Sequence, residues 1–231
     1  KQYPDLLVWV NDLYEPLYNF WNQVQIGGDV LQEQLLEIKT KNNDRDKAKE
    51  LFQTAKEEVG DSSLSNQHRA VSFYIVNKCS FSGLTESSSF SAQASESNFS
   101  IRGIEKLSGY KELIKHWKIT NYSYDFLLSG VQTKVKDAFI YLDPPYEIGS
   151  HLYGKKGDMH KYFNHDDFSK KCSECSQDLL VSYNSSQLVR DRFSDWKAIE
   201  YEHTYTMRST STYTKAQKNR KELVLLNYDL N

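Results

Sequence analysis

The stretch AFIYLDPPY, residues 138–146, decides the fold of this 231-residue chain. Its apolar first half, Ala138 to Leu142, predicts a buried strand. That strand leads directly into Asp143, Pro144, Pro145 and Tyr146. Two prolines fix two φ angles near about −65° and remove two N–H donors, so the turn is stiff and offers hydrogen-bond acceptors. A carboxylate, a carbonyl and an aromatic face together suit a planar ring that carries an amino group. The alternative is a rigid turn that only ends a strand.

Upstream of this stretch, the sequence predicts a strand and then a helical region. Leu6 to Val10 is an apolar strand that ends at Asn11-Asp12, and a helix with Pro16 in its first turn follows and ends at Gly27-Gly28. Asp44 starts a helix that Gly60 closes, and a second helix carries Ala70, Val71, Tyr74 and Asn77. The serine-rich residues 80–100 predict a long loop with aromatic anchors.

The pattern then alternates between strands and helices. We expect a helix over 111–117, a strand over 118–122 and the strand at 138–142. Asn164 or His165 can cap a helix that runs through Cys172, and a strand over 179–183, a helix over 188–193, and an antiparallel pair at 199–205 and 223–228 follow. Such alternation predicts an α/β protein with a parallel, doubly wound sheet, whose ligands bind beyond the carboxyl ends of the strands. Asp12 and Asp143 both follow predicted strands.

Composition narrows the class of protein. The 29 Lys and Arg residues nearly balance the 31 Asp and Glu residues, so nucleic acid would have to meet a local basic patch. No apolar run approaches the roughly 20 residues that cross a bilayer, and we expect a cytoplasmic protein with no membrane partner. The three cysteines include Cys172-x-x-Cys175, with His160 and His165 upstream. One such pair alone does not define a zinc site, so we expect no metal.

These residues together resemble the DNA adenine methylase family, S-adenosylmethionine-dependent N6-adenine DNA methyltransferases with an Asp-Pro-Pro-Tyr motif. Further stretches are similar to family motifs: Val10-Asn11-Asp12, Asn77 to Leu84, Tyr124-Asp125-Phe126, Ser182-Tyr183-Asn184 and Arg220 to Leu223. The resemblance implies a Rossmann-like doubly wound methyltransferase sheet with an inserted, mainly helical target-recognition region. On this interpretation residues 1–28 and 106–231 form the catalytic domain, and residues 29–105 form the insertion. Enzymes of this kind are typically of bacterial or phage-encoded type.

The resemblance also implies roles for single residues. Asp143, Pro144, Pro145 and Tyr146 would be catalytic, with Asp143 also bordering the cofactor site. Asp12 would hold the ribose hydroxyls of S-adenosylmethionine, Asp125 would accept from its adenine amino group, and Phe126 would lie against that ring. Asp12 could instead be an ordinary helix cap.

One motif of the family has no counterpart in the sequence. The glycine-rich loop that follows the family's first strand and approaches the methionine part of the cofactor is missing, and Gly27-Gly28 does not replace it because it follows a helix. We therefore expect a catalytic domain without its N-terminal part, and weak binding of S-adenosylmethionine by the chain as it stands.

Double-stranded DNA is the expected partner. Candidate contacts are Lys78 and Ser80 in the recognition-like segment, Lys155 and Lys156 after the catalytic turn, and Arg208, Lys218 and Arg220 in a basic run. Such a run could equally be a solvated face. The predicted activity is site-specific transfer of a methyl group to N6 of adenine in DNA. The alternatives are the same chemistry on cytosine N4, on an RNA base or on a protein amide, and a DNA-binding protein of this fold without methyl transfer.

Overall fold

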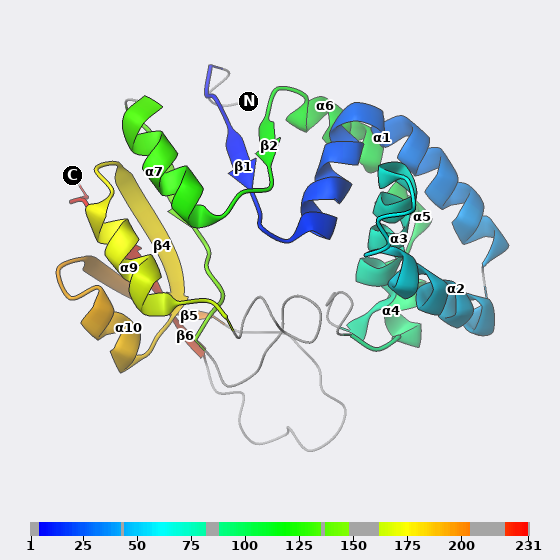
Figure 1. The fold of residues 1–231 in the computed structure, drawn as a ribbon. Helices are drawn as coiled ribbons and strands as arrows, with labels where there is room; N and C mark the ends of the chain where they lie inside the picture. The colour runs from blue at the N-terminus through cyan, green and yellow to red at the C-terminus, as the bar shows by residue number, and fades with distance from the viewer. Residues whose placement is uncertain are drawn as a thin grey trace, which may run out of the picture. The chain divides into compact units, whose positions relative to one another are not determined.

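The computed structural model describes residues 5–42, 44–81, 88–134, 137–147, 162–203 and 220–230. They fall into two compact units that divide between Ser123 and Tyr124. The described residues up to Ser123 are called the helical unit, and those from Tyr124 onward the sheet unit (Figure 1).

Helices α1 to α6 and a short two-stranded sheet make up the helical unit. The helices are α1 (Glu15–Lys41), α2 (Arg45–Glu58), α3 (Asn66–Cys79), α4 (Ala92–Ser97), α5 (Ile101–Ile104) and α6 (Leu107–Ile114). Strands β1 (Trp9–Asn11) and β2 (Lys118–Thr120) pair in parallel. The predicted start of α2 is confirmed, because the Asp44 side chain accepts a hydrogen bond from the backbone N–H of Lys47.

The expectation that Gly27-Gly28 ends the first helix is wrong. Helix α1 continues to Lys41 through a kink at Gly27, where φ is −149° and ψ is 36°. A Cβ atom at Gly28 would lie 3.0 Å from the Lys111 Cβ and 3.1 Å from the Leu107 backbone oxygen, so Gly28 allows α6 to approach α1 closely. Glycine therefore interrupts the helix locally at Gly27, and the chain resumes a helix where Gly28 packs against α6.

The serine-rich segment is not one long loop, because α4 and α5 begin within or just after it. Ser91 and Ser100 cap these helices by accepting from the backbone N–H groups of Ala94 and Gly103. The expected aromatic anchor is confirmed at Phe99, which is fully buried, whereas Phe81 is 51% exposed. Residues 82–87 lie outside the described part of the chain.

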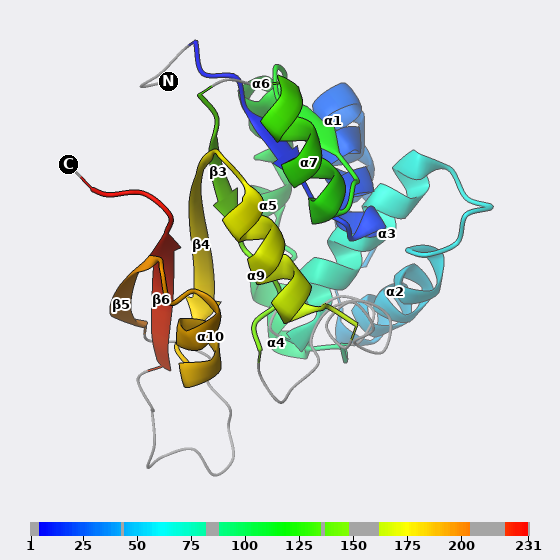
Figure 2. The ribbon, with the colours of Figure 1, turned by 60° about the vertical axis from the view of Figure 1, so that its left-hand side comes forward.

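The sheet unit contains α7 (Tyr124–Lys134), β3 (Phe139–Leu142), α9 (His165–Glu174), β4 (Asp178–Asn184), α10 (Gln187–Arg192), β5 (Lys197–His203) and β6 (Arg220–Leu226). The strands form a mixed sheet in the order β3-β4-β6-β5, in which β3 and β4 are parallel and the expected antiparallel pairing of β5 with β6 is confirmed. Helices α9 and α10 lie along one face of this sheet (Figure 2). Their apolar side chains form a core with the inward residues of β4 and β6, notably Phe168, Val189, Leu179, Val181, Leu223 and Leu225.

The chain thus has a mixed α/β structure, with its described strands divided between a two-stranded and a four-stranded sheet. Helix α7 was not expected as an element, because Tyr124-Asp125-Phe126 was interpreted as a motif and not as the start of a helix. Within the described residues, none of the helices has both the length and the apolar character needed to cross a membrane.

Candidate active site

Asp143 lies where β3 ends, beside β4. Because Leu142 pairs with Val181 in the parallel register, Asp143 comes next to Ser182. The Ser182 hydroxyl donates to Asp143 Oδ1 at 2.8 Å, and the Tyr141 hydroxyl oxygen lies 3.0 Å from the same Ser182 Oγ. The carboxylate that the sequence places at a strand end is therefore held in one orientation by the neighbouring strand.

The surroundings of Asp143 raise the pKa of its carboxyl. The residue retains exposed surface, but partial burial of the carboxyl raises its pKa, while the hydrogen bond from Ser182 lowers the pKa and the charge of Glu222 raises it. The carboxyl consequently titrates above the ordinary range of an aspartate. A carboxyl with a raised pKa holds a proton more strongly and, when ionised, is a better hydrogen-bond acceptor.

Tyr146 is joined both to the core and to a buried acid. Its ring stacks on that of Tyr183, with centroids 6.2 Å apart and an angle of 24° between the planes. Its hydroxyl lies 3.5 Å from Glu222 Oε2, which also accepts a 2.7 Å hydrogen bond from the hydroxyl of Tyr201. The acid-Pro-Pro-Tyr turn is thus attached to the sheet at both ends, through Asp143 and through Tyr146.

Glu147, the residue after the turn, is also bound to neighbouring elements. The backbone N–H of Glu147 donates to the Asn184 side chain at 2.9 Å, and the Glu147 carboxylate pairs with Arg192 at 2.6 Å. Arg192 also pairs with Asp166 at the start of α9. The side chain of Arg192 is 18% exposed, so these ion pairs are partly shielded from solvent. They fix the exit of the turn against α9 and α10.

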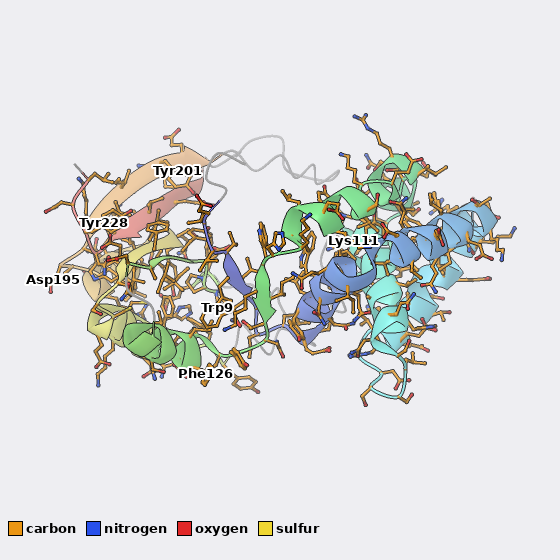
Figure 3. All side chains as sticks on the ribbon, turned by 90° about the horizontal axis from the view of Figure 1, so that it is seen from above. Trp9, Lys111, Phe126, Asp195, Tyr201 and Tyr228 are labelled. Atoms are coloured by element: carbon orange, nitrogen blue, oxygen red, sulfur yellow. The ribbon has the colours of Figure 1, made fainter. Side chains whose placement is uncertain are left out.

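The start of α7 offers an acceptor beside an aromatic ring. Asp125 Oδ1 is buried and pairs with the Lys171 ammonium, which lies 3.1 Å away. Phe126 is 57% exposed, and Figure 3 shows its side chain pointing away from α7. A buried acceptor next to an accessible ring suits an adenine group, which presents an amino group and a flat face.

Asp12 follows β1 in the helical unit, as predicted, and it is exposed. Its carboxylate accepts from the backbone N–H of Tyr14 at 2.7 Å, and its backbone oxygen accepts from the Asn121 side chain at 2.8 Å. Helix α1 has Tyr14, not Asp12, at its N-cap position. The carboxylate therefore orders the turn between β1 and α1, and its assignment to ribose hydroxyls stays a prediction.

The candidate DNA contacts are only partly described. The Lys78 ammonium lies 5.6 Å from the centre of the Tyr74 ring, and burial lowers the pKa of Lys78. Ser80 is fully buried. Arg220 opens β6, with its backbone opposite His203. Outside the described residues lie Lys155, Lys156, Arg208 and Lys218.

Sequence reasoning gave no role at the site to Ser182, Tyr201 or Glu222, although Ser182 and Glu222 lie in two of the stretches that are similar to family motifs. Ser182 follows three apolar residues of β4, whereas Glu222 follows Arg220 and Lys221 in β6, and both are only 6% exposed. A single hydroxyl after an apolar run needs a buried partner, and this is the signal that could have pointed to the contact of Ser182. For Tyr201, in the alternating strand β5, the sequence holds no comparable signal.

Cys172 and Cys175 lie in the core of the sheet unit. Burial raises the pKa of the Cys172 thiol to about 12, which disfavours the thiolate that metals bind. Among the described residues, no three His, Cys, Asp or Glu side chains are grouped so that they could hold a metal ion.

The site combines an ionisable acid, a rigid proline turn and an aromatic ring at the end of a parallel strand, a combination that suits chemistry on an amino group. The family model of D12 class N6 adenine-specific DNA methyltransferases matches residues 2–207. The chain therefore belongs to this family, and the activity of the family is methylation of adenine N6 in DNA. Its members use S-adenosylmethionine. A comparison with curated proteins finds no significant match.

Proposed function

We propose that the acid-Pro-Pro-Tyr turn of this chain carries the transfer of a methyl group from S-adenosylmethionine to N6 of adenine in DNA. The observation that supports this proposal is the fixed carboxylate at the end of β3, bonded by Ser182 at 2.8 Å. Asp143 is the acceptor for the target amino group, Pro144 supplies a second acceptor through its carbonyl, and Tyr146 supplies a ring face.

The chemical difficulty is that the amino nitrogen of adenine is a poor nucleophile, because its lone pair is delocalised into the ring. Two acceptors, Asp143 and the Pro144 carbonyl, would draw the two amino hydrogens into a defined direction and localise the lone pair on nitrogen. As the nitrogen becomes positive, the negative carboxylate of Asp143 stabilises it. The rate of methyl transfer is raised because the amino group is oriented and because the charge that develops on nitrogen is stabilised at a site organised in advance.

In a duplex the target amino group is engaged in a base pair, so the adenine has to leave the helix. The half-buried ring of Tyr146 offers the extruded base a stacking surface in place of its lost neighbours. Because Tyr146 itself lies against Tyr183, the surface is held in position before DNA arrives.

When bound, S-adenosylmethionine supplies the methyl group from its sulfonium centre. Phe126 and the Asp125 carboxylate, which pairs with Lys171, fit its adenine end. The assignment of the ribose hydroxyls to Asp12 stays a prediction. The proposed fold of the family domain is a Rossmann-like doubly wound methyltransferase sheet, and the proposed target-recognition region is residues 29–105. The proposal also keeps the candidate contacts to DNA that the sequence indicates: Lys78, Ser80, Lys155, Lys156, Arg208, Lys218 and Arg220.

The test is to identify the product. The chain is incubated with methyl-labelled S-adenosylmethionine and either unmethylated double-stranded DNA or RNA, and the labelled nucleosides are identified by mass spectrometry. The proposal expects the label in N6-methyladenine. Label in N4-methylcytosine, label in RNA only, or DNA binding without label would overturn it. DNA whose adenines are already methylated at N6 is the matched control and should accept no label.

A further inference from the structure

Glu222 is a buried acid on the sheet beneath the proposed catalytic turn. It is 6% exposed and lies on β6, opposite Asn184 of β4 and Tyr201 of β5. Burying a carboxylate is costly unless hydrogen-bond donors compensate for the lost water. The groups that donate hydrogen bonds to the buried carboxylate of Glu222 therefore indicate what this residue does.

Two tyrosine hydroxyls converge on one oxygen of this acid. The hydroxyl of Tyr201 donates to Glu222 Oε2 at 2.7 Å, and that of Tyr146 lies 3.5 Å from the same atom. The bond to Glu222, the largest cause, raises the pKa of Tyr201 to about 12, so this phenol remains a donor near neutral pH. Figure 3 labels Tyr201 on the sheet unit. Glu222 thus links the middle of the sheet to the tyrosine of the catalytic turn.

The same face of the sheet also carries the contacts of Asp143. Polar groups face this cluster from each strand and from the turn: Tyr141 of β3, Ser182 of β4, Tyr201 of β5, Glu222 of β6, and Asp143 and Tyr146. Burial raises the pKa of Asp143, the bond from Ser182 lowers it, and the negative charge of Glu222 raises it. The two carboxylates are therefore close enough to influence each other.

We propose that Glu222 is a positioning residue for methyl transfer, which fixes the Tyr146 ring and keeps a negative charge beside Asp143. The first effect sets the place of the stacking surface, and the second strengthens Asp143 as an acceptor. This inference rests on the proposed function of the Asp143 turn. It adds Glu222 of β6, which acts through Tyr146 and Asp143 and does not itself contact the substrate.

The experiment compares Glu222→Gln with the wild-type chain. The amide keeps the size of the side chain but removes its charge, so the pKa of Asp143 should fall and the acid limb of the rate profile should move to lower pH. Carbon-13 NMR of the Asp143 carboxyl follows the same shift without any need for activity. Because the neutral amide is a weaker acceptor than the carboxylate for the Tyr146 hydroxyl, the ring is held less firmly and kcat should fall by about tenfold, with a smaller change in the KM for DNA.

Two further variants separate charge from position. Glu222→Asp keeps the charge but withdraws the carboxylate from Tyr146, so kcat should fall while the titration of Asp143 stays near that of the wild type. Glu200→Gln is the matched control, because Glu200 lies on β5 but pairs with Arg190 and Lys221, away from Asp143. It should leave both the kcat and the titration of Asp143 unchanged.

Identical titration of Asp143 in wild type and Glu222→Gln, together with an unchanged kcat, would overturn the inference. A loss of thermal stability alone, with the pH profile in place, would also overturn it, since that is the result of a purely structural role. If Glu222→Gln does not fold, Glu222→Asp still decides whether position matters. If the wild-type chain methylates no adenine, the proposed function fails, and the NMR titration still reports whether the two acids are coupled.

Discussion

The two units bury different kinds of side chains. The helical unit is built around a continuous apolar and aromatic core that includes Phe20, Leu31, Leu35, Phe52, Phe73, Tyr74, Ile75 and Phe99. Some of its ion pairs, such as Lys41 with Glu37, lie at the surface, whereas the side chain of Arg69, which pairs with Glu15, is only 12% exposed. The sheet unit instead buries the acid Glu222 and partly buries the carboxyl of Asp143, with the phenols Tyr141, Tyr146 and Tyr201 around them. Apolar packing makes a unit stable, whereas buried ionisable groups cost stability and mark the place of chemistry.

The largest expected effect on stability is in the helical core. Phe99→Ala removes a fully buried ring that packs against Tyr74, with centroids 6.2 Å apart, and beneath the ammonium of Lys39. We expect a loss of about 3–5 kcal/mol in the free energy of unfolding, from lost burial and from the cavity left behind. Denaturant unfolding followed by circular dichroism measures this loss.

Phe81→Ala is the matched control, since Phe81 comes from the same serine-rich segment and is 51% exposed. It should unfold at nearly the wild-type denaturant concentration. Equal losses in the two variants would mean that Phe99 is not a core residue and that the distinction between the units is misplaced.

A smaller loss is expected from the partly buried ion pairs of the sheet unit. Arg192→Met leaves the carboxylates of Glu147 and Asp166 without their shared cation. The chain should lose about 1–3 kcal/mol of stability, read as a lower melting temperature. Lys41→Met, which breaks an exposed pair in the helical unit, should leave the melting temperature within experimental error. A greater effect from Lys41 than from Arg192 would contradict this view of the two units.

The smallest effect is expected at Ser182. Ser182→Ala removes the hydrogen bond to Asp143 that lowers the pKa of this carboxyl, so the pKa should rise. If ionised Asp143 is the active form, the acid limb of the rate profile then moves to higher pH, opposite to the shift from Glu222→Gln. At neutral pH the rate should fall by a factor of about five, corresponding to about 1 kcal/mol.

Ser173→Ala is the control for this variant, because the Ser173 hydroxyl bonds only within α9, to the backbone oxygen of Ser169. Its pH profile should match that of the wild type. A shift of the Ser182→Ala profile to lower pH would show that Ser182 does not favour the ionised form of Asp143.

Much of the local structure follows from short sequence signals. Strand β3 could be predicted because a run of apolar and aromatic residues leads into the Asp-Pro-Pro turn. Asp44 and Asn164 could be predicted as helix caps, and both side chains accept a hydrogen bond from a backbone N–H group. Each of these signals depends on neighbours within a few residues. The continuation of α1 through Gly27-Gly28 depends instead on α6, which lies far away in the sequence. A single sequence carries no local sign of that contact.

In the candidate site, too, the residues of one continuous motif could be predicted, whereas contacts between distant segments could not. Asp143 and Tyr146 were predicted from one continuous motif, and the structure attaches both to a common polar cluster. Glu222 joins that cluster only because β6 pairs with β4 and β5, a pairing that brings together residues far apart in the sequence. The strand pairing could be expected in part, but not which side chains it would bring to the turn.

The central claim is that the chemistry of this chain lies with Asp143 at the end of β3, and Asp143→Ala tests it most directly. The measurement is the single-turnover rate of methyl transfer to adenine N6, with the melting temperature and the affinity for S-adenosylmethionine determined on the same protein. The account predicts a loss of about 100- to 1000-fold in rate, as for removal of one preorganised hydrogen-bonding group, with folding and cofactor affinity largely intact. A variant that keeps more than about a tenth of the wild-type rate would contradict it, because so small a loss is far below what such a group contributes.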